Sequence, residues 1–265
     1  MAWFFLGAIV LYATYCCTFI FFQSFFIFRP EKLPADYVFN PGISFREINI
    51  HADDGTSLNG LLLQPEATKG TVIYFHGNWK NLDNYLPFTK KFTDLGYSVL
   101  IPDYRSYGKS AGKLTEKNFY TDTQHWYSIA RQYQHPEKIF IYGRSLGTAA
   151  AAYLASQQPC KQLILETPFS NMYDIARRYG MPFSDGSYLS FSFRTDLIIK
   201  SITVPIIILH GTKDETVSIH SGKKLLESLK EGDRFVEIAN GRHKNLDQFN
   251  EYHLALDEVL NADSK

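Results

Sequence analysis

The sequence predicts an α/β protein built on one mostly parallel sheet of eight strands, with helices on both faces. Three observations lead to this fold class. The 265 residues are enough for a large core. Strand-like and helix-like segments alternate after an opening hairpin, which is typical of parallel sheets. Segments such as residues 71–75 are continuous apolar runs, as expected for strands covered on both faces.

The first element is an apolar segment, because residues 1–28 contain no Lys, Arg, Asp or Glu. As a helix it would span roughly 40 Å, more than a bilayer core of about 30 Å requires. A cleaved signal peptide fits poorly, since the run ends in phenylalanines, and a lipoprotein signal fits poorly because Tyr15 precedes Cys16. We expect a single transmembrane helix at residues 1–28, a linker at 29–42 and one folded domain at 43–265. A buried hairpin or a cleaved signal remains the alternative.

The domain at residues 43–265 should begin with a hairpin around the Asp53-Asp54-Gly55 turn. The eight expected strands are residues 43–50, 57–63, 71–75, 97–101, 138–142, 163–165, 206–209 and 235–238. The expected helices are residues 82–95, 116–133, 146–156, 221–230 and 246–260. Residues 168–200 show no clear strand.

The main chemical motif is Gly143-Arg144-Ser145-Leu146-Gly147, between an expected strand and an expected helix. A nucleophilic serine needs a tight turn with glycines two residues to either side, and the helix behind it favours negative charge at the reacting oxygen. Gly108-Lys109-Ser110-Ala111-Gly112 has the same pattern, but a polar loop surrounds it. We therefore predict Ser145 as the nucleophile and interpret Ser110 as part of a surface or entrance loop.

A catalytic serine needs a base and an orienting acid, in the order serine, acid, histidine for this topology. Among the downstream histidines, we predict His243 as the base because it lies in a glycine-containing loop after the last strand. His210 ends a strand and should be structural, while His220 and His253 should be solvated on helices. Asp214 follows the carboxyl end of a strand, where open α/β sheets place their sites. It is the predicted acid, with Glu215 and Glu166 as competitors.

The strand at 71–75 ends in Phe75-His76-Gly77-Asn78, whose backbone amides can face a reacting carbonyl. We predict the amides of Asn78 and Leu146 as the oxyanion hole, and His76 as a residue that stabilises the turn. The cysteines Cys16, Cys17 and Cys160 form neither a disulfide framework nor a zinc spacing. No metal and no cofactor is expected.

These motifs resemble those of the α/β-hydrolase-fold serine hydrolases, and most closely of their membrane-anchored branch. The matching segments are Tyr74-Phe75-His76-Gly77-Asn78, Asp103-Tyr104-Arg105-Ser106-Tyr107-Gly108-Lys109-Ser110, Gly143-Arg144-Ser145-Leu146-Gly147, His210-Gly211-Thr212-Lys213-Asp214 and Gly241-Arg242-His243. Ser106 departs from the pattern, which usually has glycine there. The resemblance implies the α/β-hydrolase fold with a small cap, and hydrolysis of esters, thioesters or lipids without a cofactor.

The family's topology also implies a sheet-covering helix at residues 171–179 and leaves little chain for a lid. We therefore expect an open, substrate-binding cleft lined by aromatic and apolar side chains of the cap, with the alternative that these side chains only pack the cap against the domain. The predicted set is Met181, Phe183, Tyr188, Phe191 and Phe193.

The leading functional hypothesis is a membrane-tethered serine hydrolase acting on a small-molecule acyl ester or an acylated protein. A peptidase is the second, although the cap offers only Asp174, Asp185 and Asp196 to bind a substrate amine. A catalytically inactive membrane-bound scaffold is the third. Zero net charge gives no electrostatic case for nucleic acid as a partner. Arg29 and Lys32 follow the apolar segment, which favours a cytoplasmic catalytic domain.

Overall fold

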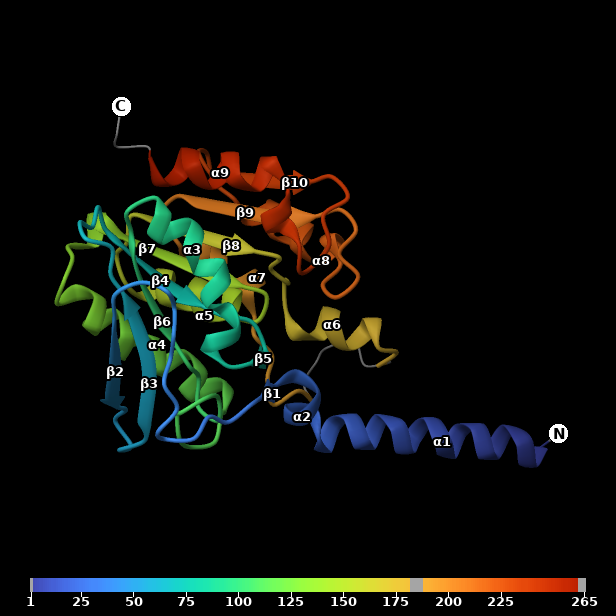
Figure 1. Cartoon of the computed structure of the whole chain (residues 1–265). Helices are drawn as coiled ribbons and strands as arrows, with labels where there is room; N and C mark the ends of the chain where they lie inside the picture. The colour runs from blue at the N-terminus through green and yellow to red at the C-terminus, as the bar shows by residue number, and fades with distance from the viewer. Residues whose placement is uncertain (1, 182–187, 262–265) are drawn as a thin grey trace.

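The computed structural model of the chain describes residues 2–181 and 188–261 (Figure 1). Its central sheet has eight strands in the order β10-β9-β8-β7-β4-β6-β3-β2, and β3 alone among them runs antiparallel to both of its neighbours, β2 and β6. This confirms the predicted fold class. The strands are β2 (Phe45–His51), β3 (Ser57–Leu63), β4 (Thr71–Phe75), β6 (Ser98–Pro102), β7 (Ile139–Arg144), β8 (Gln162–Glu166), β9 (Ile206–Gly211) and β10 (Arg234–Ile238).

Helices cover the sheet on both faces, and the sheet separates two apolar cores, one under each layer of helices. One core lies beneath α4 (Glu116–Arg131), α5 (Gly147–Gln157), α7 (Thr195–Ile198) and α8 (Ile219–Lys223). The other lies beneath α3 (Leu86–Asp94) and α9 (Asn250–Leu260). Short 3-10 turns complete the domain at η1 (Leu82–Tyr85), η2 (Pro136–Lys138), η3 (Ile199–Ser201), η4 (Lys224–Ser228) and η5 (Leu246–Gln248).

Three helices are shorter than the sequence predicts, because the segments 82–95, 221–230 and 246–260 are each part α-helix and part 3-10 turn. In the first of them, Pro87 stands in the first turn of α3. Proline has no amide hydrogen to donate and therefore favours the start of a helix over its interior. The true α-helix accordingly begins at Leu86, behind the η1 turn.

The apolar N-terminal segment forms two helices, α1 (Ala2–Phe21) and α2 (Gln23–Ile27), where a single helix over residues 1–28 was predicted. The chain turns at Phe22 because Gln23 docks on the domain. The Gln23 side chain is buried, accepts from the Ser190 amide at 2.6 Å and donates to the Tyr188 carbonyl at 3.3 Å. Residues 3–21 of α1 are long and apolar enough to cross a membrane by length and composition.

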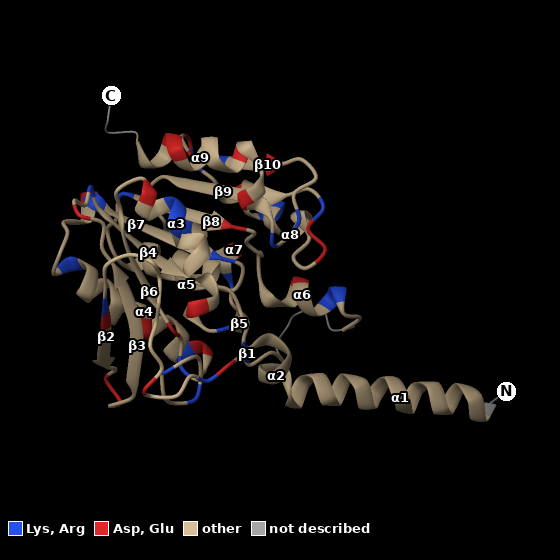
Figure 2. Ribbon diagram, viewed as in Figure 1, with Lys and Arg blue, Asp and Glu red and all other residues tan. Residues whose placement is uncertain are grey.

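α1 extends away from the domain, and neither α1 nor α2 carries a charged side chain (Figure 2). The domain itself carries charges of both signs, without one dominant patch in this view. Directly after α2, the chain joins the domain. β1 (Arg29–Pro30) pairs in parallel with β5 (Trp79–Lys80), and the Leu33 amide donates to the Gly108 carbonyl at 3.1 Å. The start of the segment predicted as a linker is therefore ordered against the domain.

The helix α6 (Met172–Arg178) lies outside the sheet-covering layer, which corrects the role expected for residues 171–179. α6 runs beside α1 (Figure 1). Two hydroxyls of α1 donate to backbone carbonyls directly after α6: Tyr15 to that of Tyr179 at 2.6 Å and Tyr12 to that of Gly180 at 2.8 Å. The expected covering position is taken by α7 and η3, which pack on α5. Residues 171–179 therefore belong to the cap.

Candidate active site

Ser145 lies at a sharp turn between the end of β7 and the start of α5. Its φ angle of 52° falls in the left-handed region, which a non-glycine residue adopts only where its surroundings enforce it. The flanking glycines allow the turn to pack. A Cβ on Gly143 would lie 2.5 Å from the Gly147 carbonyl oxygen, and one on Gly147 would lie 2.0 Å from the Phe75 carbonyl oxygen. The turn therefore requires glycine at both positions.

The structure brings the predicted serine, histidine and aspartate together from three separate loops. The Ser145 Oγ lies 2.9 Å from His243 Nε2, and His243 Nδ1 lies 2.7 Å from Asp214 Oδ2. The Asp214 side chain is fully buried and the imidazole is 12% exposed. Because Nδ1 faces a carboxylate, it carries the proton, and Nε2 is then free to accept the hydroxyl proton of Ser145.

Asp214 is held from several sides. Its Oδ1 accepts from the amides of Thr216 and Val217, both at 2.8 Å, and its Oδ2 also lies 3.5 Å from Nε2 of His210. Burial raises the pKa of Asp214, but the hydrogen bonds from His210 and His243 outweigh it and hold the pKa well below its usual range. The carboxylate is therefore ionised when it orients His243.

The contact of His210 with Asp214 was not predicted from the sequence. His210 is fully buried at the end of β9, and its Nε2 lies 3.0 Å from the Val217 carbonyl oxygen as well as near Asp214. Its predicted structural role fits this position. The signal that could have indicated the contact is the four-residue spacing between His210 and Asp214, where the chain turns back past the strand end.

The competing acids face other partners. Glu166 is buried under Ser145, with one oxygen 3.3 Å from Arg144 Nε and the other accepting from the Tyr142 hydroxyl. Glu215 is exposed and lies 3.4 Å from Arg242 Nη1. Neither carboxylate has a contact with His243 among the described residues.

The competing histidines are also placed elsewhere. His220 is exposed, while His253 is half-buried with its Nε2 2.7 Å from the Asp247 carbonyl oxygen. Among the candidate histidines, His243 is therefore the one that contacts Ser145.

The loop of the predicted oxyanion hole lies over Ser145, since a Cβ on Gly77 would be 3.6 Å from the Ser145 Cβ. His76 Nδ1 faces the Gly77 carbonyl oxygen at 2.7 Å. A trans peptide points its N–H opposite its carbonyl, so the Asn78 amide is directed away from His76. Within the described chain, neither this amide nor that of Leu146 donates to a protein acceptor. Both are available to a ligand.

His76 is fully buried, and its Nε2 lies 3.2 Å from Asp103 Oδ1. The same carboxylate oxygen accepts from the Leu82 amide at 2.8 Å. Asp103 and His76 thus link the chain after β6 to the turn after β4. This matches the predicted role of His76 in stabilising the turn.

Ser110, in the second glycine-serine motif, was interpreted as part of a surface or entrance loop, but its side chain is fully buried. Its hydroxyl donates to the Asp103 carbonyl at 2.8 Å and accepts from the Asn59 amide at 2.8 Å, so it ties the loop to β3. Ser106, where glycine is usual, has a φ angle of 71°, and its hydroxyl donates to the Gly112 carbonyl at 2.8 Å. These hydroxyls serve the loop and not the reaction centre.

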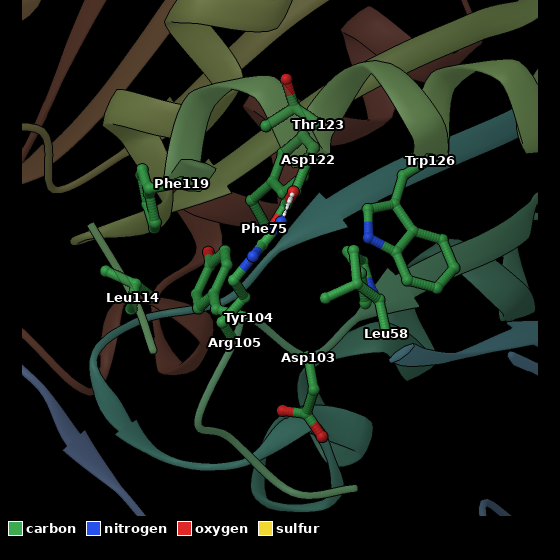
Figure 3. Close-up of a pocket in the computed structure, with 11 residues that line it drawn as sticks. Leu58, Phe75, Asp103, Tyr104, Arg105, Leu114, Phe119, Asp122, Thr123 and Trp126 are labelled. Atoms are coloured by element: carbon green, nitrogen blue, oxygen red, sulfur yellow. Dashed lines mark hydrogen bonds and ion pairs between the residues drawn. The ribbon is translucent and has the colours of Figure 1, made fainter. Parts of the chain in front are cut away.

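Behind the same loop lies a small hollow next to α4, bordered by Arg105, Tyr104, Phe119 and Trp126 (Figure 3). Arg105 makes a bidentate contact with Asp122, at 2.7 and 2.9 Å. The hollow has a volume of about 10 Å³, room for about one water molecule and no substrate. Its role is therefore structural.

The pocket that contains Ser145, Asn78 and Leu146 has a volume of about 270 Å³. Its domain wall comes from Phe169, α6 and the chain after Asp214, with side chains that include Met172, Ile175, Tyr179 and Val217. The opposite wall comes from the N-terminal helices, through Tyr15, Phe19, Phe26 and Ile27. Residues 1–28, expected as a transmembrane helix, therefore also line the pocket that contains Ser145.

The described members of the predicted substrate-binding set do not line this pocket. Met181 is buried against Cys16 and Phe19, and Phe191 packs edge-on against Phe28 with ring centroids 4.7 Å apart. Tyr188 and Phe193 are also absent from the lining, and Phe193 is fully buried. Phe183 lies outside the described residues. The described aromatic residues of this segment hold the N-terminal helices and the cap on the domain, the alternative considered for them from the sequence.

Comparison with known proteins identifies similar chains. Residues 66–182 match the family model described as serine aminopeptidase, S33. The chain is 27% identical over 233 residues to the uncharacterized protein YfhR of Escherichia coli, covering 83% of this chain and 80% of that protein. It is 30% identical over 190 residues to the human alpha/beta hydrolase domain-containing protein 17B, covering 69% of this chain but only 64% of the human protein.

Some solved structures superpose on most of this chain, although their sequences have little identity with it. The Pyrococcus furiosus esterase Pf2001 superposes with a TM-score of 0.72 at 19% identity, covering 90% of this chain and 98% of the esterase. The α/β hydrolase GrgF from Penicillium gives a TM-score of 0.65 at 16% identity, covering 83% of this chain and 99% of its own. These likenesses establish the fold.

Proposed function

The chain is a hydrolase of the α/β-hydrolase fold, and on that premise we propose that it cleaves carboxylic ester or thioester bonds through an acyl-enzyme on Ser145. One observation carries the proposal. The Ser145–His243–Asp214 hydrogen-bond chain, at 2.9 and 2.7 Å, opens into a pocket whose walls are mostly apolar. Hydrolysis of an acyl group needs this pairing of an activated hydroxyl with space for the acyl chain.

In the proposed mechanism, Ser145 Oγ attacks the carbonyl carbon while His243 Nε2 takes the hydroxyl proton. The negative charge on the carbonyl oxygen is stabilised by the amides of Asn78 and Leu146, an effect worth several kcal/mol in comparable sites. His243 then returns the proton to the leaving alcohol or thiol. A water molecule, deprotonated by His243, attacks the acyl-enzyme and releases the acid and free Ser145.

The substrate class we propose is a small-molecule acyl ester or an acylated protein. The pocket next to Ser145 favours an acyl group, because Phe169, Met172, Ile175 and Val217 offer apolar contacts and no hydrogen-bonding side chain. Among the described pocket-lining residues, Arg29 is the only charged one.

A peptidase is the second candidate, favoured by the family model that residues 66–182 match. Cleavage next to a free amino terminus needs a carboxylate at the site to bind the amine. Asp174 instead accepts from Lys224 Nζ at 2.6 Å and Ser170 Oγ at 2.6 Å, and Asp196 is paired with Arg194 at 2.8 Å. Asp185 lies outside the described residues. The described site therefore supports the esterase over the peptidase.

We also propose that α1 anchors the protein in a membrane, with the catalytic domain on the cytoplasmic side. Support comes from the 19-residue apolar span and from Arg29 and Lys32 directly after the apolar segment. Alkaline carbonate extraction should leave the full chain in the membrane pellet. Release into the supernatant would contradict the anchor.

Turnover of p-nitrophenyl acetate by the full chain in detergent tests the proposed reaction. Ser145→Ala should lose activity by several orders of magnitude, because the substitution removes the attacking oxygen. Ser110→Ala is the matched control: it removes a buried hydroxyl of the loop and should keep most of the turnover. Loss of activity in Ser110→Ala together with retention in Ser145→Ala would refute the assignment. Equal, near-zero turnover in the parent chain and both variants would favour a scaffold.

A further inference from the structure

The N-terminal helices form one wall of the pocket that contains Ser145. Tyr15, Phe19, Phe26 and Ile27 line it opposite α6. On α1, Tyr12, Cys16 and Phe19 recur at helical spacing, and this face meets the cap: Cys16 and Phe19 are buried against Ala176 and Met181. The pocket is therefore complete only with the segment that could span a membrane.

The same segment also holds the oxyanion loop. Asn78 Nδ2 donates to the Ile27 carbonyl at 2.8 Å, and the Arg29 amide donates to the Asn78 carbonyl at 3.0 Å. The Tyr107 hydroxyl is a second donor to that carbonyl, at 2.9 Å. Asn78 is thus fixed between the domain and the chain leaving α2. The N-terminal segment contacts both the pocket and the residue whose amide faces the ligand.

Beyond the pocket, α1 continues outward as an exposed apolar helix. Its side chains from Trp3 to Leu11 are more than half exposed at nearly every large apolar position, and α1 projects clear of the domain (Figure 1). A continuous apolar surface of this kind is typical of a helix that lies in a membrane or against another protein. The outer part of α1 is therefore suited to a bilayer, while its inner part forms the pocket wall through Tyr15 and Phe19.

We propose that this pocket binds the acyl chain of an amphiphile that resides in the same bilayer as α1, and that the chain reaches Ser145 along α1 without crossing water. The inference rests on the proposed function, because it assigns the pocket to the acyl group of the ester or thioester that Ser145 attacks. The occupant is a long, flexible acyl chain: Phe169, Ile175 and Val217 on the domain side face Phe19 and Phe26 on the helix side.

The first test uses the full chain reconstituted in phosphatidylcholine vesicles and a two-chain phospholipid with a fluorogenic long-chain ester, which exchanges slowly between vesicles. With enzyme and substrate in the same vesicles, we expect hydrolysis at least about tenfold faster than with them in separate vesicles. Equal rates in the two arrangements would overturn the proposal, because the chain would then reach Ser145 through water.

The second test measures kcat/KM for p-nitrophenyl esters from acetyl to dodecanoyl in detergent. Each methylene buried in the transition state should raise kcat/KM by up to about fourfold until the pocket is filled. Phe19→Ala should lower the ratio of dodecanoyl to acetyl kcat/KM at least about tenfold. Phe5→Ala, on the exposed outer part of α1, is the matched control and should leave that ratio unchanged.

Ile175→Trp, on the opposite wall, should move the best substrate to a shorter chain, which loss of folding would not do. An unchanged chain-length profile in both Phe19→Ala and Ile175→Trp would overturn the proposal. A parent chain that cleaves the acetyl ester but neither the dodecanoyl ester nor the phospholipid would also refute it, with the proposed function intact. A parent chain that fails to cleave any ester contradicts the proposed function itself.

Discussion

At the scale of single residues, the site depends on which carboxylate reaches the imidazole. Three acidic residues lie close to the candidate triad in sequence or space, and they differ in what they contact. Asp214 accepts from His243, Glu166 is paired with Arg144, and Glu215 is exposed. All three side chains are carboxylates, so their positions decide which of them orients His243.

Asp214→Asn should lower kcat for p-nitrophenyl acetate by about 10³- to 10⁴-fold, because an amide at this position no longer fixes the tautomer of His243. KM should change little, since Asp214 is not on the pocket wall. Glu215→Gln, the exposed neighbour, serves as the control and should stay within about twofold of the parent. A large loss in Glu215→Gln with near-normal turnover in Asp214→Asn would move the acid to Glu215.

Asp214 should also shape the acid stability of the protein. Its pKa is lowered in the folded chain, whereas an unfolded aspartate titrates near 3.9. A group of this kind stabilises the fold fully above its unfolded pKa, and the contribution is lost as pH falls through the folded value. The parent Tm in detergent should therefore drop more between about pH 5 and pH 3 than the Tm of Asp214→Asn. Parallel curves for the two proteins would contradict this.

At the scale of elements, the tight turn at Ser145 couples β4, β7 and α5. Gly147 lets the first turn of α5 pass directly over the end of β4, where a Cβ would overlap the Phe75 carbonyl. This close approach places Leu146 beside the loop that carries Asn78. The oxyanion donors are thus aligned by backbone contacts between elements.

Gly147→Ala should separate α5 from β4, destabilise the chain by about 1–3 kcal/mol or more, and reduce kcat by misplacing the Leu146 amide. Chemical denaturation of the variant and its turnover of p-nitrophenyl acetate measure the two effects. Gln157→Ala, at the exposed end of the same helix, is the matched control with both quantities near the parent values. A variant Gly147→Ala with parental stability and kcat would contradict the packing argument.

The sequence predicts the sheet well because its signals are local. Residues 57–63 and 71–75 were predicted with the observed bounds of β3 and β4. The first segment follows the Asp53-Asp54-Gly55 turn of a hairpin, and the second is a continuous apolar run, typical of a strand covered on both faces. The glycine-serine motif indicated Ser145 because it lies between a predicted strand and a predicted helix, which is also a local signal. Asp214 and His243 were found by the fixed order of elements around the sheet.

What the sequence does not predict is packing between distant segments. The break at Phe22 and the burial of Gln23 depend on residues 188 and 190, more than 160 positions away. Likewise, the aromatic residues Phe191 and Phe193 have the composition of a substrate cleft, but in the structure both rings pack against Phe28, and Phe193 also packs against Phe119. Hydropathy identifies apolar side chains but not the surface that covers them.

At the scale of the whole molecule, the apolar N-terminus and the catalytic domain form one unit. Phe28 and Phe191 bury each other, and Ile27 and Arg29 hold the loop of Asn78. The boundary expected at residue 28 therefore falls inside a packed interface. A shortened chain beginning at Pro30 would expose Phe191 and lose both hydrogen bonds to Asn78.

We therefore expect the chain beginning at Pro30 to aggregate or to hydrolyse p-nitrophenyl acetate at least about tenfold more slowly than the full chain. A chain beginning at Gln23 keeps α2 and both contacts of Asn78, and serves as the control that should retain most turnover. Both are compared in detergent, by size-exclusion chromatography and by kcat. A soluble, fully active chain beginning at Pro30 would show that the N-terminal segment does not support the site.

The proposed reaction depends above all on Ser145 as the nucleophile. Labelling of the full chain with a fluorophosphonate, followed by mass spectrometry of its peptides, tests this most directly. We expect one covalent adduct, on Ser145, which disappears in Ser145→Ala and persists in Ser110→Ala. An adduct on Ser110, or undiminished labelling of Ser145→Ala, would contradict it.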